Sequence, residues 1–354
     1  MSQEYFSEDE KLEVVRLLGE LGASPEHIAS ILENPLQDYP PSMLFGRRAT
    51  LSAVGLSSET GMDLSEVHRL YRLCGVPFDD VDEIRFGHRD VALCKLFHLV
   101  GAGFMPTDER DDLFRLVGAS IARISEGSIA SYSQVVEVPI WDDGFSAIES
   151  IRSLHTGVQV VEQMADGISG LLRHHFAEST ERQRLAQATD SNRLLYRSAV
   201  GFIDLVGFTA ISRKMSIEEL ASVVREFEAR AFDIVTDFGG RVVKHIGDEV
   251  MFTAPTVESG CAAVLGLIDG FSDERVQPRG GLAFGDMLTR GGDHYGPVVN
   301  LASRLGDHAV PGEVLCDAGV AEGIGDGYVA EPAGRRQLKG FDEPIRVWSL
   351  SHCP

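Results

Sequence analysis

The fold of the C-terminal half is decided by the stretch Arg241-Val-Val-Lys-His-Ile-Gly-Asp-Glu-Val-Met-Phe-Thr-Ala254. Two runs rich in β-branched and apolar residues flank the dipeptide Gly247-Asp248, a combination that is typical of a tight β-hairpin. A pair of glycines, Gly239 and Gly240, comes directly before it and ends the preceding helical pattern. The stretch therefore predicts two antiparallel strands joined by a two-residue turn.

Upstream of the hairpin, the sequence predicts a strand followed by a helix. The strand is the apolar run Ala199-Val-Gly-Phe-Ile-Asp-Leu-Val206, which is interrupted by one carboxylate. Ser216 and Glu219 then fit a capping box, and the apolar face of the helix that they open continues to Val235.

Downstream of the hairpin, four further elements are predicted. They are a helix near 258–271, a strand near 279–288, a helix near 297–308 and a strand near 313–317. The resulting β-α-β-β-α-β order predicts an α+β fold, a ferredoxin-like core with additions and with helices on one face of the sheet.

The N-terminal half follows a different pattern, because it reads as short helices. Ser7 and Glu10 form a capping box, and Ser24-Pro25 opens a second helix. We expect an all-helical domain over residues 1–157, a helical linker over 158–197 and an α+β domain over 198–354.

Composition limits the class of protein. The chain has 354 residues and a net charge of −22, which argues against a surface that binds nucleic acid through many phosphates. Its five cysteines have no CxxC spacing, so neither a disulfide framework nor a zinc site is indicated. The acidic N-terminus and the lack of a long apolar run predict a cytoplasmic protein without a membrane segment.

Two carboxylates stand out by their positions. Asp204 interrupts an apolar strand, where an unpaired charge is costly, and Asp248 lies on a turn that the fold can bring beside that strand. Together with the Leu205 carbonyl they could hold Mg²⁺, which accepts one or two carboxylates plus phosphates and water. Taken alone, Asp248 is more often an ordinary turn former.

Three longer segments carry a family resemblance. They are Phe202-Ile-Asp-Leu-Val-Gly-Phe-Thr-Ala-Ile-Ser212, Gly240-Arg-Val-Val-Lys-His-Ile-Gly-Asp-Glu-Val-Met251 and Asp293-His-Tyr-Gly-Pro-Val-Val-Asn-Leu-Ala-Ser-Arg304. In order and separation they resemble the signature segments of class III adenylyl cyclases, and the resemblance covers about residues 198–350. The actinobacterial members of that family carry a helical regulatory domain before the cyclase domain, as residues 1–157 would be here.

The resemblance implies an activity and a set of roles. The enzyme would convert ATP to 3′,5′-cyclic AMP and pyrophosphate as a head-to-tail homodimer with shared active sites. Each site would take its metal ions from one subunit and Lys244, Asp293, Asn300 and Arg304 from the other. Asp204 and Asp248 would bind two metal ions, Mg²⁺ or Mn²⁺, in each site. Lys244 and Asp293 would select adenine, and the pair Asn300 and Arg304 would stabilise the transition state.

Elementary chemistry agrees with these roles. A lysine donor and an aspartate acceptor match adenine N1 and its 6-amino group, whereas guanine presents the opposite pattern. Asn300 and Arg304 are four residues apart and so share a helix face, from which a guanidinium can meet charge on a phosphate. Such spacing is also common on ordinary solvated helices, and Lys244 alone could be a surface lysine.

Two further segments point to phosphate binding. Gly207, Phe208 and Thr209 lie between the first strand and its helix, where backbone N–H groups can bind phosphate. Lys339, within Arg335-Arg-Gln-Leu-Lys-Gly-Phe341, resembles the family lysine that contacts the triphosphate. The alternatives are an ordinary turn glycine and a solvated basic strand end.

Three rival functions remain. A diguanylate cyclase shares the core fold, but its turn differs from Ile246-Gly-Asp-Glu-Val250. A catalytically silent ATP-binding relative would normally have lost at least one of the six site residues. The segment Leu56 to Phe104 weakly resembles a MerR-type DNA-binding domain, yet residues 1–196 hold 31 Asp and Glu against 17 Lys and Arg, which disfavours DNA.

The linker suggests one regulatory hypothesis. His174 and His175 are adjacent there, and histidine is the side chain that titrates in the physiological range. Mild acidification could therefore shift the linker and alter activity. Two ordinary surface histidines are the alternative.

Overall fold

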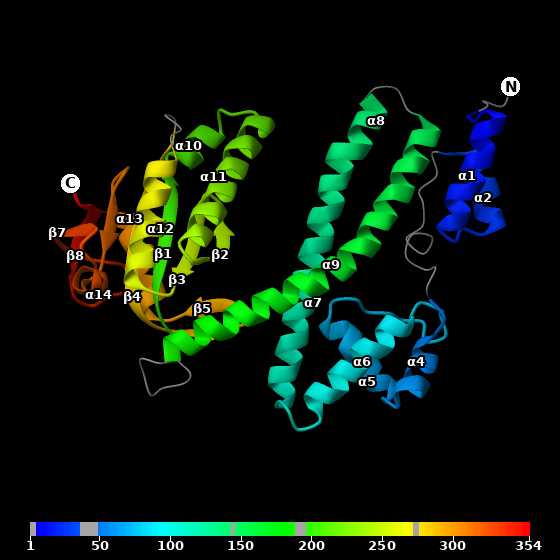
Figure 1. Cartoon of the computed structure of the whole chain (residues 1–354), viewed down its shortest axis with the longest axis horizontal. Coiled ribbons are helices and arrows are strands. Elements are labelled where there is room, and N and C mark those ends of the chain that lie inside the picture. The colour runs from blue at the N-terminus through cyan, green and yellow to red at the C-terminus, as the bar shows by residue number, and fades with distance from the viewer. Residues whose placement is uncertain (1–4, 36–48, 143–145, 188–195, 272–275) are drawn as a thin grey trace. The chain divides into compact units, whose positions relative to one another are not determined.

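The computed structural model describes residues 5–35, 49–142, 146–187, 196–271 and 276–354 of the chain. Its contacts divide the chain into two compact units, Met1–Arg173 and His174–Pro354. The first unit is built from helices, and the second contains the sheet (Figure 1). None of the described helices combines the length and the apolar character that crossing a membrane would require.

The N-terminal region is all-helical, as the sequence predicts. Its elements are α1 (Glu8–Glu20), α2 (Pro25–Glu33), α4 (Ala53–Thr60), α5 (Leu64–Leu73), α6 (His88–Gly101), α7 (Thr107–Tyr132), the π-helical turn η2 (Ser133–Glu137), α8 (Val138–Asp142) and α9 (Ala147–Gln187). The predicted helix starts at Ser7 and Ser24 are confirmed, because each hydroxyl caps its helix.

Helix α9 is longer than the predicted linker helix. It begins at Ala147, upstream of residue 158, and it continues from the first unit into the second. Residues 188–195 of the predicted linker lie outside the described residues, and the last two residues of that linker, Tyr196 and Arg197, already belong to a strand. The composition of this region is compatible with a helix throughout, so it does not mark where the helix ends.

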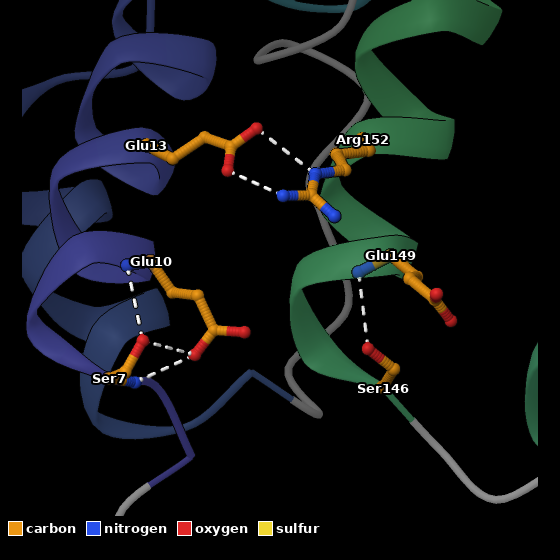
Figure 2. A network of polar contacts seen from close by, with 6 residues as sticks. All are labelled: Ser7, Glu10, Glu13, Ser146, Glu149 and Arg152. Atoms are coloured by element: carbon orange, nitrogen blue, oxygen red, sulfur yellow. Dashed lines mark hydrogen bonds and ion pairs between the residues drawn. The ribbon is translucent and has the colours of Figure 1, made fainter.

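Helices α1 and α2 pack against the first turns of α9. The shared apolar core includes Leu18 of α1 and Ile151 of α9, both fully buried. Beside this core, Arg152 donates from Nε and Nη2 to the carboxylate of Glu13, over 3.0 and 2.7 Å (Figure 2). A second polar contact joins His155 Nε2 and Glu20 Oε2 at 2.9 Å.

Helices α4 to α7 form a separate apolar core. Gly61 makes the turn between α4 and α5, and its positive φ of 71° explains the glycine. Asp111 of α7 is buried and is paired with both Arg69 and Arg110. The Arg110 guanidinium also stacks on the Phe97 ring, 4.0 Å from its centroid.

The second unit contains a sheet flanked by helices. After the end of α9, its elements are β1 (Tyr196–Val206), α10 (Phe208–Ser212), α11 (Ile217–Asp237), β2 (Arg241–Ile246), β3 (Glu249–Ala254), α12 (Val257–Gly270), β4 (Gln277–Arg290), β5 (Asp293–Tyr295), α13 (Pro297–His308), β6 (Val314–Cys316), α14 (Ala318–Gly323), β7 (Tyr328–Arg336) and β8 (Ile345–His352). The sequence-based elements are confirmed within a few residues, and the capping box of Ser216 and Glu219 is present.

The sheet confirms the ferredoxin-like core. Its order is β2-β3-β1-β4-β6-β8-β7, with β5 paired to β4 alone. The first four strands in that order are the four strands of the predicted β-α-β-β-α-β unit. Only β4 and β6 are parallel; the other described pairs are antiparallel. Strands β7 and β8 extend the sheet beyond the part that the sequence predicts.

Helices cover both faces of the sheet, so the prediction of helices on one face is wrong. Alternate residues of β1 separate two cores. Ile203 and Leu205 pack with α11 and α12, whereas Val200 and Phe202 pack with α13. The prediction misses this because the helix near 297–308 belongs to the additions beyond the ferredoxin-like unit.

Helix α13 lies very close to β4. A Cβ on Gly281 would overlap the carbonyl oxygen of Ala302 and the backbone nitrogen of Gly306. The backbones of strand and helix therefore meet without a side chain between them. Any residue larger than glycine at position 281 would push α13 off the sheet.

Candidate active site

Asp204 lies near the end of β1, on the face of the sheet that α13 covers. It pairs in register with Glu249 of β3 and Arg279 of β4, and residues opposite one another in antiparallel strands share a face. Arg279 donates from Nη2 and Nε to Asp204 Oδ2, over 2.8 and 3.0 Å. Its Nη1 also donates to the carbonyl oxygens of Asp307 and Ala309, so this arginine joins β1 to the end of α13.

Asp248 lies in the β2–β3 turn, next to the end of β1. The N–H of Leu205 donates to the Asp248 carbonyl oxygen over 3.3 Å, which joins the turn to the residue after Asp204. Burial raises the pKa of Asp248, and the charge of Asp204 raises it further. The structure therefore brings the two predicted carboxylates close enough to interact.

A third carboxylate, which the sequence analysis did not single out, lies beside them. Glu249 is directly opposite Asp204, and burial together with the charges of Asp204, Asp307 and Asp248 raises its pKa to about 7. The alternation of the predicted hairpin places Glu249 on the same face as Lys244. Only the register between β1 and β3 reveals that this face also carries Asp204.

The carboxylate pair fits a divalent cation. Among the described residues, no group of three or more His, Cys, Asp and Glu side chains could hold a metal ion. Magnesium commonly binds through one or two carboxylates and takes its other ligands from substrate and water. The mutual repulsion that raises the pKa of Asp248 is the interaction that a cation between the two carboxylates would relieve.

Lys244 and Asp293, the predicted adenine-selecting residues, are in direct contact. Lys244 lies on β2 opposite Met251, and Asp293 begins β5. The Lys244 Nζ donates to Asp293 Oδ2 over 2.5 Å. Burial alone would raise the pKa of Asp293, but hydrogen bonds from Lys244 and from the N–H of His294 lower it overall, so the carboxylate is charged.

Asn300 and Arg304 lie on the side of α13 that faces away from its apolar core. Asn300 is exposed, and Arg304 is half-buried with its Nη1 2.7 Å from Asp307 Oδ2. Among the described residues, the structure shows no hydrogen bond from either side chain to Asp204 or Asp248. The chain thus presents this pair outward, separately from the carboxylates.

The four residues predicted to bind phosphate lie in two places, three of them after β1 and one after β7. Gly207 has a φ of 86° and precedes the short helix α10. Phe208 packs against the core beneath α11 and α12, and the side chain of Thr209 lies outside the described part of the chain. Lys339 is exposed in the turn after β7. Their roles stay predictions.

Arg279 is the main site residue that sequence reasoning missed. It stands at the start of the predicted strand 279–288, where an arginine is unremarkable by itself. Its position opposite Asp204 follows from the pairing of β1 with β4, which sequence alone does not reveal. Knowledge that Arg279 lies opposite the partly buried Asp204 would have identified this arginine as a site residue.

Known proteins are similar to this chain in sequence, and a solved structure is similar to part of it. The crystal structure of the adenylyl cyclase CyaB from P. aeruginosa is similar over 45% of this chain and 97% of its own, at 22% identity and a TM-score of 0.40. An adenylate cyclase from Glutamicibacter nicotianae is 30% identical over 349 residues, which cover 92% of this chain and 85% of the relative.

An adenylate cyclase from Streptomyces coelicolor is 32% identical over 295 residues, or 82% of this chain and 76% of the relative. No protein-family model matches the chain. The ferredoxin-like core and the sequence similarity to these relatives are those expected of a nucleotidyl cyclase of class III. The chain belongs to that family, among its actinobacterial adenylate cyclase homologues.

Proposed function

We propose that this chain is an adenylyl cyclase that converts ATP to 3′,5′-cyclic AMP and pyrophosphate. The observation that carries the proposal is the contact between Lys244 and Asp293 on the sheet face that also presents Asp204. A donor and an acceptor held side by side suit adenine N1 and its 6-amino group. The relatives that are named adenylate cyclases support the same substrate.

Asp204 and Asp248, with the Leu205 carbonyl, are the residues that would hold Mg²⁺ or Mn²⁺. A bound cation supplies Lewis-acid stabilisation of the charge that develops on the α-phosphate. Arg279 neutralises Asp204 in the free protein, and its N–H donors suit phosphate oxygens once that carboxylate binds a cation. The arginine thus provides a fixed positive charge beside the reacting phosphate.

Asn300 and Arg304 would complete the site of a second copy of the chain. Both point away from the apolar core of α13, and Arg304 is held only by Asp307 of the next turn among the described carboxylates. From that position, the guanidinium would stabilise transition-state charge and the amide would orient the ribose. This exposure supports a homodimer with shared sites.

The test is to incubate the purified chain with ATP and Mg²⁺ or Mn²⁺ and to identify the product by chromatography and mass. We expect cyclic AMP and pyrophosphate in equal amounts, with GTP a much poorer substrate. A silent relative would bind ATP in calorimetry and form no product. Cyclic diguanylate or cyclic GMP from GTP as the preferred product would contradict the proposal.

We also infer that the N-terminal helices regulate the cyclase domain. The support is α9, a continuous helix that carries the packing of α1 and α2 at one end and runs into the second unit at the other. His174 and His175 are exposed on this helix, whereas His155 is largely buried against Glu20. Comparing the activity of wild type with that of His174→Ala, His175→Ala and His155→Ala between pH 5.5 and 8 tests which histidine matters. Identical pH profiles would exclude all three.

A further inference from the structure

A second polar pocket lies in the unit His174–Pro354, away from the metal carboxylates. It has a volume of about 280 Å³ and is bordered by the last turns of α9 and by β1, β2, β3, β4 and β5. Three arginines and a histidine line it: Arg182, Arg197, Arg241 and His294. Among the described residues that line it there is no aspartate or glutamate.

This lining is unusual for the chain, whose net charge is −22. Other arginines of the same unit are matched with carboxylates, such as Arg279 with Asp204 and Arg304 with Asp307, both within 2.8 Å. Within the pocket, Arg182 and Arg197 each have a looser carboxylate partner, Glu178 at 3.4 Å and Asp286 at 4.0 Å. Arg241 is the pocket arginine for which the described residues supply no ion pair.

Arg241 is the pocket residue whose positive charge is least compensated. It is half-buried, and no described carboxylate forms an ion pair with it. Its Nη2 donates to the Gly292 carbonyl oxygen over 3.2 Å and lies 2.9 Å from His294 Nε2. Burial lowers the pKa of Arg241, and the nearby charge of Arg182 lowers it further. The charge of Asp293 opposes this lowering in part. Arg241 thus keeps its charge in a partly desolvated space without an ion-paired carboxylate, a situation that an anion would make more favourable.

His294 holds that arginine in place as a neutral ring. A guanidinium can only donate, so Nε2 of His294 is the acceptor. Its proton is then on Nδ1, which lies 2.8 Å from Thr289 Oγ1. Burial and the Arg241 charge lower the pKa of His294 to about 4, which agrees with a neutral imidazole. The polar contacts from Thr289 to His294 and from His294 to Arg241 therefore hold the Arg241 guanidinium in one orientation.

We propose that this pocket binds a small oxyanion of the phosphate class, either inorganic phosphate or a phosphate monoester. Arg241 would be its main ligand, because a guanidinium group can bind two phosphate oxygens at once. Arg182 and Arg197 would add positive charge at the sides of the pocket. The volume is just below the usual range of small-molecule pockets, about 300–1,000 Å³, which suits a ligand smaller than a nucleotide.

The pocket also has a direct connection to the adenine-selecting pair. Gly292 and His294, which both contact Arg241, are the neighbours of Asp293 in the chain. An anion on Arg241 would hold this three-residue segment more firmly. The binding itself does not depend on cyclase activity, so the two proposals can fail separately.

The test is isothermal titration of the full chain with inorganic phosphate and, in a second arm, glycerol phosphate, without divalent cations and with chloride matching the ionic strength. We expect saturable binding of at least one of them to wild type. Arg241→Gln should weaken it at least about tenfold, the scale for removing one partner of a buried charge pair. Arg182→Gln should weaken it by a smaller factor.

Two controls separate this pocket from other cations. Arg346→Gln removes a cation that lies over the Trp348 ring outside the pocket and should leave affinity unchanged. Arg279→Gln removes the cation beside Asp204 and should also leave it unchanged. If Arg241→Gln does not fold, as circular dichroism would show, the partly exposed Arg182→Gln decides. No saturable binding, or binding that is lost only in Arg279→Gln, would overturn the proposal.

Discussion

At the scale of single residues, the candidate site is held by ion pairs that each serve two elements. Arg279 joins β1 to the end of α13, and Lys244 joins β2 to β5. Removing one member therefore changes both the chemistry of the site and the position of the neighbouring element. Each substitution needs a control on an equivalent surface residue.

The first prediction concerns Asp204. Asp204→Ala should lower the rate of cyclic AMP formation by about 10²-fold or more, because it removes a cation ligand and frees Arg279 at the same time. Asp269→Asn, which changes an exposed carboxylate paired with His352, should keep the wild-type rate. Product is measured by chromatography at saturating ATP. Near-normal activity of Asp204→Ala would remove this residue from the metal site.

The second prediction concerns substrate choice. Asp293→Asn replaces a pure acceptor with an amide that can also donate to guanine O6, so the ratio of kcat/KM for ATP over GTP should fall by about tenfold or more. Asp286→Asn on the neighbouring strand β4 is the control. An unchanged ratio, with both variants folded, would mean that adenine is selected elsewhere.

The residue types of the site could be predicted from sequence, but not all of their contacts. Asp204 and Asp248 were identifiable because one interrupts an apolar strand and the other lies on a glycine turn. Arg279 and Glu249 were not, because their relevance depends on strand register, which arises from long-range pairing. The pocket around Arg241 was equally hidden, since its lining comes from six separate elements.

At the scale of elements, the attachment of α1 to α9 depends mainly on apolar burial. Leu18→Ala should lower the free energy of unfolding of the first unit by about 2–5 kcal/mol, because the side chain is fully buried. Leu12→Ala on the same helix should cost less than about 0.5 kcal/mol, because that side chain is 72% exposed.

Denaturant unfolding followed by far-ultraviolet circular dichroism measures this effect, because the first unit is built from helices. Equal midpoints for the two leucine variants would show that the packing of α1 contributes little. The exposed pair of Glu13 and Arg152 should contribute little in either case, since it is screened by solvent.

His294 on β5 gives the stability of the second unit a pH dependence. The pKa of His294 is lowered to about 4 from an ordinary 6.5. The unfolded chain therefore takes up this proton first, and stability that is complete above pH 6.5 is lost as the pH falls toward 4. His294→Gln should lose about 1–2 kcal/mol less than wild type between pH 7 and pH 4.5.

Trp348 reports this loss in a Trp141→Phe background. Glutamine can accept from Arg241 and donate to Thr289 as the imidazole does, so the variant keeps the support while losing the titration. The same pH slope in both proteins would show that His294 titrates normally in the folded chain.

The local elements were largely predictable because capping boxes, glycine turns and apolar periodicity are local signals. The starts of α1, α2 and α11 and the β2–β3 hairpin all follow from them. Local signals did not predict which face of the sheet α13 covers, nor that β7 and β8 extend the sheet. Those features depend on which side of the sheet a connection crosses, and no local pattern encodes that.

At the scale of the whole molecule, the proposed enzyme is a pair of chains. Asp204→Ala and Arg304→Ala should each be inactive as homodimers, but a mixture should regain activity. Random exchange of equal amounts makes half of the dimers mixed, each with one intact site, so about a quarter of wild-type activity is expected. Cyclic AMP formation after co-refolding measures it. Inactive mixtures with mixed dimers demonstrated would place the whole site within one chain.

The close approach of Gly281 to α13 limits how such an enzyme can be controlled. Strand β4 carries Arg279, and α13 carries Asn300 and Arg304. The two backbones are in direct contact at Gly281, with no side chain between them. The helix can neither roll nor slide on the strand without a collision. Arg279, Asn300 and Arg304, which we propose for the site, thus move together, and a signal would have to move β4 and α13 as one body.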